Sequence, residues 1–251
     1  MNPAPDSIVG RGLPQAGRRR LALAGVVFLL ASAPAVAKSY RVVDLMVDAR
    51  FERDGTLRVE EAITCRLTGR YRFAYRDIPT SGEVSISNVG IREAGMVFAQ
   101  STGESPGTFK IAPLGGRTRV TWHDRAHNET RTFHLTYTLS GAVKRFPDIG
   151  ELYFKFVGDG WDRPLGRVRA TVHLPGTVPA AEIRAWAHGP LQGLVLPPQD
   201  STVVMSVRPL PARTFFEGRV LFPATVLAAA HVSGATPRLD MILAEEKQWA
   251  A

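Results

Sequence analysis

The feature that most constrains the fold is the alternation of apolar and polar residues within positions 130–161. Two runs there place an apolar side chain at every second position: Phe133, Leu135, Tyr137 and Leu139, then Leu152, Phe154 and Phe156. Successive side chains of a pleated strand leave on opposite faces, so this period of two indicates half-buried strands. Turn-forming residues, Ser140-Gly141 and Pro147-Asp148, separate the two runs. The stretch therefore predicts core strands of an all-β domain.

The same pattern recurs along the chain. Residues 40–51 and 56–67 flank Asp54-Gly55 and predict a hairpin, because glycine tolerates the positive φ of a tight turn. A second hairpin is expected from 117–123 and 130–139 around a turn at 124–129. Further short strands are expected at 84–89, 91–98, 108–111, 167–174, 183–187, 202–207 and 213–222. Such spacing predicts an antiparallel, immunoglobulin-like β-sandwich, with two packed lobes as one possible arrangement.

The first 37 residues have the layout of an export signal. Arg18-Arg19-Arg20 precede an apolar run, Leu21–Leu30, and Ala35-Val36-Ala37 supplies a small-x-small cleavage site. The run is shorter than the roughly 20 residues of a transmembrane helix. We expect cleavage after Ala37, leaving residues 38–223 as an extracytoplasmic β-region in the periplasm or cell envelope. A twin-arginine signal and an uncleaved anchor remain alternatives.

Charge and cysteine content exclude two classes of protein. The net charge is +8, but an exported protein does not meet nucleic acid in the cytoplasm. The single cysteine excludes an internal disulfide framework. Cys65 falls on the apolar side of its predicted strand and is interpreted as a small core residue.

The sequence changes character after Pro223. Residues 224–251 predict a linker and a short helix from about Pro237 to Ala250, with Thr236 as N-cap. The apolar side of this helix is narrow and a lone helix of this length is marginal in water, so we expect it to pack on the β-region, to pair with a partner or to lie at a membrane surface with Trp249 at the interface.

Several short motifs together resemble a bacterial family of predicted membrane proteins, domain of unknown function 2207. They are Asp54-Gly55 with Val59-Glu60-Glu61, Tyr75-Arg76-x-Ile78-Pro79, Tyr137-x-Leu139-x-Gly141-Ala142-Val143, Asp148-x-x-Glu151-Leu152-Tyr153, Trp161, Leu174-Pro175, Trp186-x-His188-Gly189 and Arg219-x-Leu221-Phe222-Pro223. The resemblance implies an exported β-rich domain, a short acidic helical segment and then transmembrane helices. It therefore favours a C-terminal helix that makes few contacts with the β-region and leads as a stalk towards the membrane. The printed sequence ends at Ala251, where that pattern would place the first membrane segment. The resemblance brings no catalytic residues with it.

The best binding candidates are Arg70, Arg72 and Arg76, which alternate with Tyr71, Phe73 and Tyr75. Alternation would present the arginines on one face and the aromatic rings on the other. Guanidinium groups favour phosphate and carboxylate partners, so this face suits an anionic lipid, an acidic glycan or an envelope protein. The competing interpretation is an ordinary strand with a charged outer face and an aromatic inner one, in which Arg76 pairs with Asp77 or a buried carboxylate.

The one cluster with the density of a metal site is His123-Asp124-x-x-His127-x-Glu129. It falls in the predicted hairpin turn, without a third converging ligand group, so we predict no metal and no cofactor and keep His123 and His127 as the weak alternative. Nucleophile-elbow, P-loop and HExxH motifs are absent from the sequence. We therefore expect a non-enzymatic binding or interaction module of a membrane-associated protein or system. An envelope enzyme with a site assembled from scattered residues, metal-dependent or not, and a structural scaffold are the alternatives.

Overall fold

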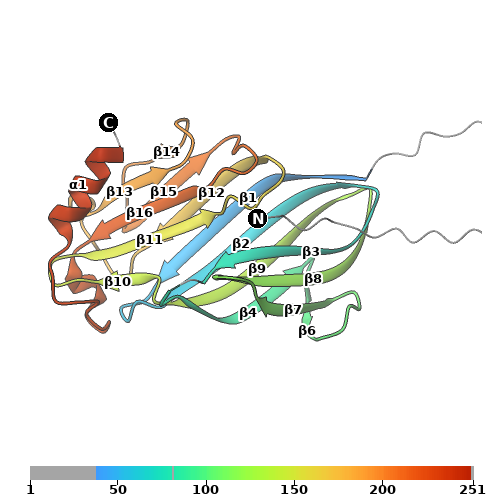
Figure 1. Cartoon of the computed structure of the whole chain (residues 1–251), viewed down its shortest axis with the longest axis horizontal. Helices are drawn as coiled ribbons and strands as arrows, with labels where there is room; N and C mark the ends of the chain where they lie inside the picture. The colour runs from blue at the N-terminus through green and yellow to red at the C-terminus, as the bar shows by residue number, and fades with distance from the viewer. Residues whose placement is uncertain (1–37, 81, 250–251) are drawn as a thin grey trace, which may run out of the picture. The chain divides into compact units, whose positions relative to one another are not determined.

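The computed structural model describes residues 38–80 and 82–249, so the predicted export segment lies outside the described residues. The described chain forms three sheets and one α-helix (Figure 1). The prediction of an all-β fold with a short C-terminal helix is confirmed. No described helix has the length and apolar character needed to cross a bilayer.

The large sheet holds eight strands in the order β14-β15-β12-β1-β2-β9-β4-β5. Their bounds are β1 Ser39–Phe51, β2 Leu57–Thr68, β4 Ser85–Glu93, β5 Met96–Val97, β9 Thr130–Ser140, β12 Leu165–His173, β14 Leu194–Val195 and β15 Thr202–Val207. Six of its neighbouring pairs are antiparallel and one, β1 with β12, is parallel. One face of this sheet is buried and the other carries charged residues such as Asp48, Arg58 and Arg169.

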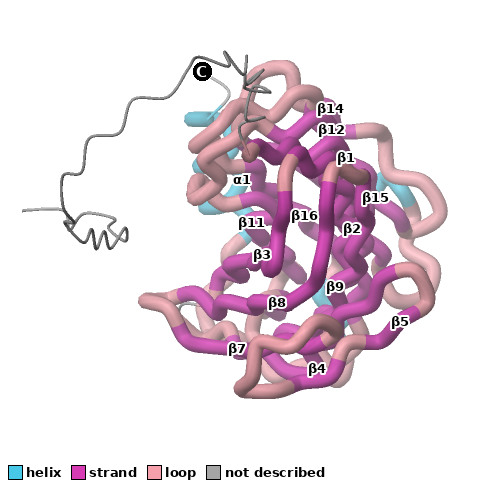
Figure 2. The backbone as a smooth tube through the Cα atoms, turned by 90° about the vertical axis from the view of Figure 1, so that its right-hand side faces the viewer, coloured by secondary structure: helices cyan, strands magenta, loops and turns pink. Residues whose placement is uncertain are grey.

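Two smaller sheets cover the buried face of the large one (Figure 2). One has the order β3-β8-β7-β6, with β3 Arg70–Pro79, β6 Ala99–Gln100, β7 Thr108–Pro113 and β8 Arg117–His127. The other has the order β10-β11-β16-β13, with β10 Val143–Arg145, β11 Gly150–Val157, β13 Arg184–His188 and β16 Phe216–Phe222. They are called sheet B and sheet C below, and the large one sheet A.

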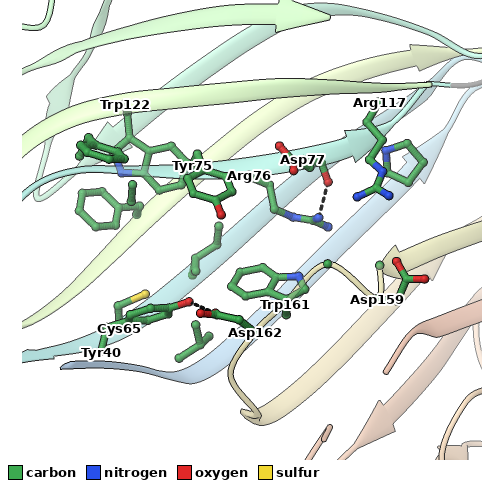
Figure 3. Close-up of a pocket in the computed structure, with 18 of the residues that line it drawn as sticks. Tyr40, Cys65, Tyr75, Arg76, Asp77, Arg117, Trp122, Asp159, Trp161 and Asp162 are labelled. Carbon is green, nitrogen blue, oxygen red and sulfur yellow. Dashed lines mark hydrogen bonds between the residues drawn. The ribbon is translucent and has the colours of Figure 1, made fainter. Parts of the chain in front are cut away.

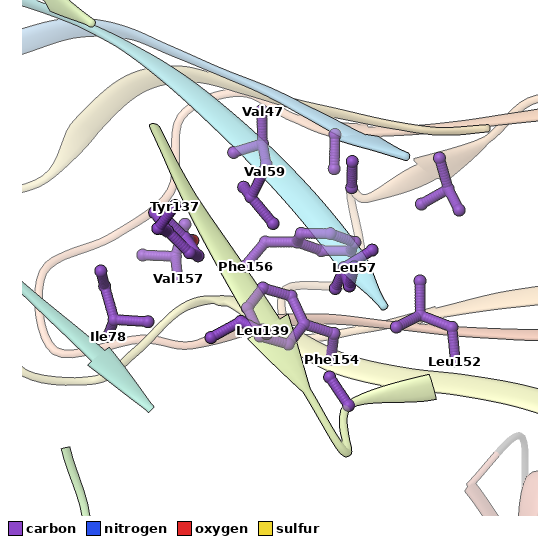
Figure 4. Packing of buried hydrophobic residues seen from close by; sticks show 14 of the residues in the cluster. Val47, Leu57, Val59, Ile78, Tyr137, Leu139, Leu152, Phe154, Phe156 and Val157 are labelled. Atoms are coloured by element: carbon purple, nitrogen blue, oxygen red, sulfur yellow. The ribbon is translucent and has the colours of Figure 1, made fainter. Parts of the chain in front are cut away.

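A single apolar core lies under both smaller sheets. Trp122 of sheet B packs on Phe133 of sheet A, with ring centroids 5.4 Å apart, and Phe222 of sheet C stacks on Phe51 at 4.8 Å. The side chains predicted to be buried on β9 and β11 are at most 6% exposed (Figure 4). Period-two alternation thus identified the inward faces correctly.

The prediction of a second hairpin from 117–123 and 130–139 is wrong: β8 pairs with β3 and β7 in sheet B, whereas β9 pairs with β2 and β4 in sheet A. The turn expected at 124–129 is reduced to Asn128 and Glu129, because β8 continues to His127 by pairing with β3. Asn128 has φ +53°, and its side-chain oxygen accepts a 2.6 Å hydrogen bond from the amide of Gly69, the residue between β2 and β3. At this corner the chain passes from sheet A to sheet B between β2 and β3, and back to sheet A between β8 and β9.

The expectation of a nearly free C-terminal helix is wrong. α1 (Leu239–Trp249) buries Ile242 completely in a second apolar cluster with Phe146, Ile149 and Leu221. Its first amides, those of Arg238 and Leu239, donate to the Asp148 carboxylate, so an acid from another part of the chain caps the helix. The segment before α1 also packs on the domain: it contains the 3-10 turn η2 (Ala224–Leu227), in which Leu227 is fully buried. Another 3-10 turn, η1 (Ala180–Glu182), precedes β13.

Candidate functional site

A cleft of about 1000 Å³ lies between sheets B and C. One wall is the outer strand of sheet B, β3, and the other is β11 with the loop that follows it, residues 158–162. The floor comes from sheet A and includes Tyr40, Ile63, Cys65 and Phe133. The cleft exists because two narrow sheets, separated along one edge, cover a single wide one (Figure 1).

Arg76 lies at the point where the three sheets meet. It is 2% exposed, and its guanidinium donates to the Glu61 carboxylate of β2 at 2.8 and 3.1 Å. It also donates to the backbone carbonyl of Phe156 on β11, at 2.7 Å, and to that of Asp77, at 2.6 Å. Tyr137 adds a hydroxyl hydrogen bond to Glu61 at 2.8 Å. Burial disfavours the guanidinium charge, but Glu61 outweighs it and keeps the pKa of Arg76 above its ordinary value.

The three predicted binding arginines line the same cleft but have different surroundings. Arg70 and Arg72 are exposed at its rim, whereas Arg76 is bound by Glu61 beneath it. The faces differ from the expectation near the end of the strand: Arg76 and Ile78 lie on the buried face of β3, so alternation places Tyr75 on the exposed face. Phe73 and Tyr75 are about half exposed, at 56% and 49%. The pairing of Arg76 with a buried carboxylate matches the competing interpretation, and a binding role for Arg70 and Arg72 remains a prediction.

The two histidines of the weak metal alternative diverge. His123 is 4% exposed, on the inner part of β8, where its ring lies 3.4 Å from the Thr108 hydroxyl. His127 is exposed at the end of β8 and contacts Asn128. Within residues 38–80 and 82–249, no three His, Cys, Asp or Glu side chains cluster as metal ligands would.

The aromatic lining of the cleft includes residues that sequence reasoning did not select (Figure 3). Tyr40 donates its hydroxyl hydrogen bond to Asp162, which ties the 158–162 loop to sheet A. Trp161 lies over the Arg76 guanidinium, 5.8 Å from ring centroid to Cζ. Trp122 is 2% exposed, and its indole nitrogen, Nε1, has no acceptor among the described residues.

Cys65 is only partly enclosed by the core and opens on the floor of the cleft. Burial raises the pKa of its thiol to about 11. Sequence alternation placed Cys65 on the correct face, but only the separation of the two smaller sheets makes that position part of a cleft.

Among the described residues, more cations than acids of the cleft lining lack a side-chain partner. Most of its acids have partners: Asp77 pairs with Arg119, Asp124 with Arg131 and Glu217 with Lys155, while Asp162 accepts from Tyr40. Four lining cations have neither an ion pair nor a side-chain hydrogen bond with any described residue: Lys38, Arg70, Arg72 and Arg117. Lys38 instead lies over the Tyr71 ring, at 4.2 Å. Asp159 is the one lining acid in the described chain with no such partner.

These features define an all-β domain with a large, aromatic, positively charged cleft between two sheets. The chain belongs to the family described as the N-terminal domain of predicted membrane proteins, DUF2207, which matches residues 41–222. No curated protein matches the sequence significantly.

Solved structures resemble the chain only in part. An M1 zinc metallopeptidase from Deinococcus radiodurans shares 14% identity over 74% of this chain and 42% of its own, with a TM-score of 0.39. A proposed nutrient-binding protein from Legionella pneumophila shares 11% identity over 73% of this chain and 67% of its own, with a TM-score of 0.47. The chain spans about two fifths of the peptidase. Structural similarity this weak carries no information about the activity of the chain.

Proposed function

We propose that this chain is a non-enzymatic binding module in the extracytoplasmic part of a membrane-associated protein or system. Its ligand is held in the cleft between sheets B and C and is released chemically unchanged. Membership of a predicted membrane protein family supports the membrane association, and the N-terminal signal pattern supports the location.

The observation that carries the proposal is the cleft itself. Its volume of about 1000 Å³ is at the upper end for a ligand pocket, and its lining combines rings with a few polar groups, as binding sites commonly do. Tyr75 and Trp161 offer apolar surface, while Arg70 and Arg72 offer charge-assisted hydrogen bonds to an anionic group. Arg76 positions the walls rather than contacting the ligand, because it is 2% exposed and four of its five N–H donors are used by Glu61, Phe156 and Asp77.

Site-specific photo-cross-linking in the producing cell tests the proposal. A benzophenone amino acid replaces Phe73, which lines the cleft, or Leu194, which is equally exposed on β14 outside it. We expect a defined adduct at position 73 and none at 194. Equal adducts at both positions, or none at either, would contradict a ligand site in the cleft.

Two further measurements separate this proposal from its alternatives. Ligand extracted from the purified protein and incubated with fresh protein should keep its mass; conversion to a product would indicate an enzyme. Stoichiometric zinc that disappears in the His123→Ala variant would support the metal-dependent alternative.

A further inference from the structure

We propose that the cleft accepts an extended acidic polypeptide segment, which adds as a strand between β3 and β11. This inference rests on the proposed function, since it assumes that the cleft is the binding site. It goes further by naming the ligand class and the way in which the ligand is held.

The two walls of the cleft are sheet edges. β3 is the last strand of sheet B, so its outer side has no strand partner. On the facing edge of β11, β10 pairs only with Gly150, Glu151 and Leu152, which leaves the backbone from Tyr153 onward without a strand on that side. Unpaired edges of this kind are templates for an added strand.

The lining residues show that the cleft runs along these edges. It is lined by every residue from Arg70 to Asp77 and by Tyr153, Phe154 and Lys155 in succession. Successive side chains of a strand point to opposite faces, so a cavity that touches all of them follows the strand's edge. At about 3.3 Å per residue, the eight residues of β3 match an extended segment of seven or eight residues.

Arg76 already makes one hydrogen bond to the free edge of β11, as the backbone of an added strand would. From β3 it reaches across and donates to the backbone carbonyl of Phe156 on β11. The two strands are thus separated by the span of a side chain, whereas directly paired strands lie about 4.8 Å apart. A segment lying beside Arg76 would supply backbone donors and acceptors to the rest of both edges and would join sheets B and C.

The charged residues of the cleft lining favour an acidic segment. Arg70, Arg72, Arg117 and Lys38 line the cleft without an ion-pair partner among the described residues, against two lining acids without one, Asp159 and Asp162, of which Asp162 accepts from the Tyr40 hydroxyl. Carboxylates on one face of the added strand would satisfy these cations, most strongly through the arginine forks.

Trp122 provides an independent indication. A buried indole N–H without an acceptor is uncommon, because desolvation without a hydrogen bond costs free energy. Trp122 lies on the wall of the cleft (Figure 3), where an oxygen of the segment, such as a backbone carbonyl, would accept its hydrogen bond.

The test uses the chain from Lys38 to Ala251 and a capped heptapeptide in which Glu alternates with Val. One control peptide has the same sequence with N-methylated Val residues, which removes backbone donors along one edge and keeps the charge. A second control replaces Glu with Lys. Affinity is measured by fluorescence anisotropy, and the site is identified by protection of Cys65, the only cysteine, from a maleimide.

We expect the acidic peptide to bind and to slow Cys65 modification. N-methylation should weaken binding at least tenfold, and the basic peptide should not bind. Arg72→Glu should weaken binding about tenfold, whereas Arg169→Glu, the same charge change on the exposed face of sheet A, should not.

Three results would overturn the inference: equal binding of the N-methylated peptide, binding that leaves Cys65 unprotected, or no binding of the acidic peptide. If the acidic peptide fails while residue 73 still cross-links to a non-peptide ligand, the proposed function stands and only the ligand class is wrong. If both experiments fail, the cleft is not a binding site.

Discussion

Arg76 carries its positive charge inside the molecule because every neighbouring group that it needs is within hydrogen-bond distance. Its carboxylate partner, Glu61, comes from sheet A, and a carbonyl, that of Phe156, comes from sheet C. Both side chains of the pair are at most 2% exposed. A buried pair is costly to break, because the remaining charge is left without compensation.

We therefore expect Arg76→Ala to lower the free energy of unfolding by about 3–5 kcal/mol. The double variant with Arg76→Met and Glu61→Leu should lose less than the single variant, since it leaves no isolated charge. Urea denaturation of the three proteins measures this. A loss below about 1 kcal/mol for Arg76→Ala would show that the pair contributes little to stability.

Cys65 should report the state of the cleft through its reactivity. Its thiol pKa is raised from 9.0 to about 11 by burial, so near neutral pH the folded protein holds about 100-fold less thiolate than an unfolded chain. Because the thiolate is the reacting form, modification by a disulfide reagent at pH 8 should be slower by about that factor and should accelerate as the pH rises towards 11. Stopped-flow absorbance in buffer and in urea makes the comparison. Equal rates in the two conditions would mean that Cys65 is not enclosed.

At the scale of elements, α1 shows how a helix of modest amphipathicity can still dock. Its apolar contribution rests on Ile242, and buried ion pairs add to it: Arg219 of β16 binds Glu245 and Glu246 of the helix as well as Glu151 of β11. His188 pairs with Glu246 and stacks on Trp249. A narrow apolar side was therefore a poor guide, because acids of the helix also bind a cation on the sheet.

Removing the helix should be destabilising. Deletion of residues 237–251 would expose Ile149 and Leu221 and would leave Arg219 with one of its three carboxylates, so we expect the melting temperature to fall by several degrees. Ile242→Ala alone should cost about 2–5 kcal/mol. Met241→Ala, at a position 43% exposed, is the matched control and should change stability by no more than about 0.5 kcal/mol. Differential scanning calorimetry measures all three; an unchanged melting temperature after the deletion would support a free stalk.

At the scale of the whole molecule, the two smaller sheets depend on the same large one. Residues of all three sheets belong to one buried cluster, in which Trp122, Phe133, Phe51 and Phe222 are members. Within the residues that the structure describes, sheet B has no other sheet on which to bury its apolar side, and sheet C has only α1 on its other face. The described domain should therefore unfold in one step.

Fluorine NMR of protein labelled with fluorotryptophan tests this cooperativity, because each of the four tryptophans gives its own signal. The native signals of Trp122 in sheet B and Trp186 in sheet C should disappear at the same urea concentration. Distinct midpoints would show that the sheets unfold separately.

The sequence predicted most strands and their inward faces because alternation and turn residues are local signals. It did not predict that the strands form three sheets, nor that β12 lies parallel to β1, because pairing between distant strands leaves no local pattern. The candidate site was harder for the same reason. Arg70 and Arg72 were predicted as binding residues because they lie two positions apart in one basic, aromatic run. Trp122, Trp161 and Cys65 come from separate segments, which only the sheet arrangement brings together.

The position of β3 also determines which molecules can reach its free edge. A sheet edge at the rim of a protein can pair with the edge of any neighbouring copy, and such pairing leads to aggregation. The outer side of β3 faces β11 across a cleft, and the 158–162 loop, held by Tyr40 and Arg76, lies beside it. A folded domain is too thick to enter this space, but a single extended chain is not. We therefore expect the recess to act as a size filter, which limits pairing with other copies of the molecule and leaves the edge accessible to an unfolded segment.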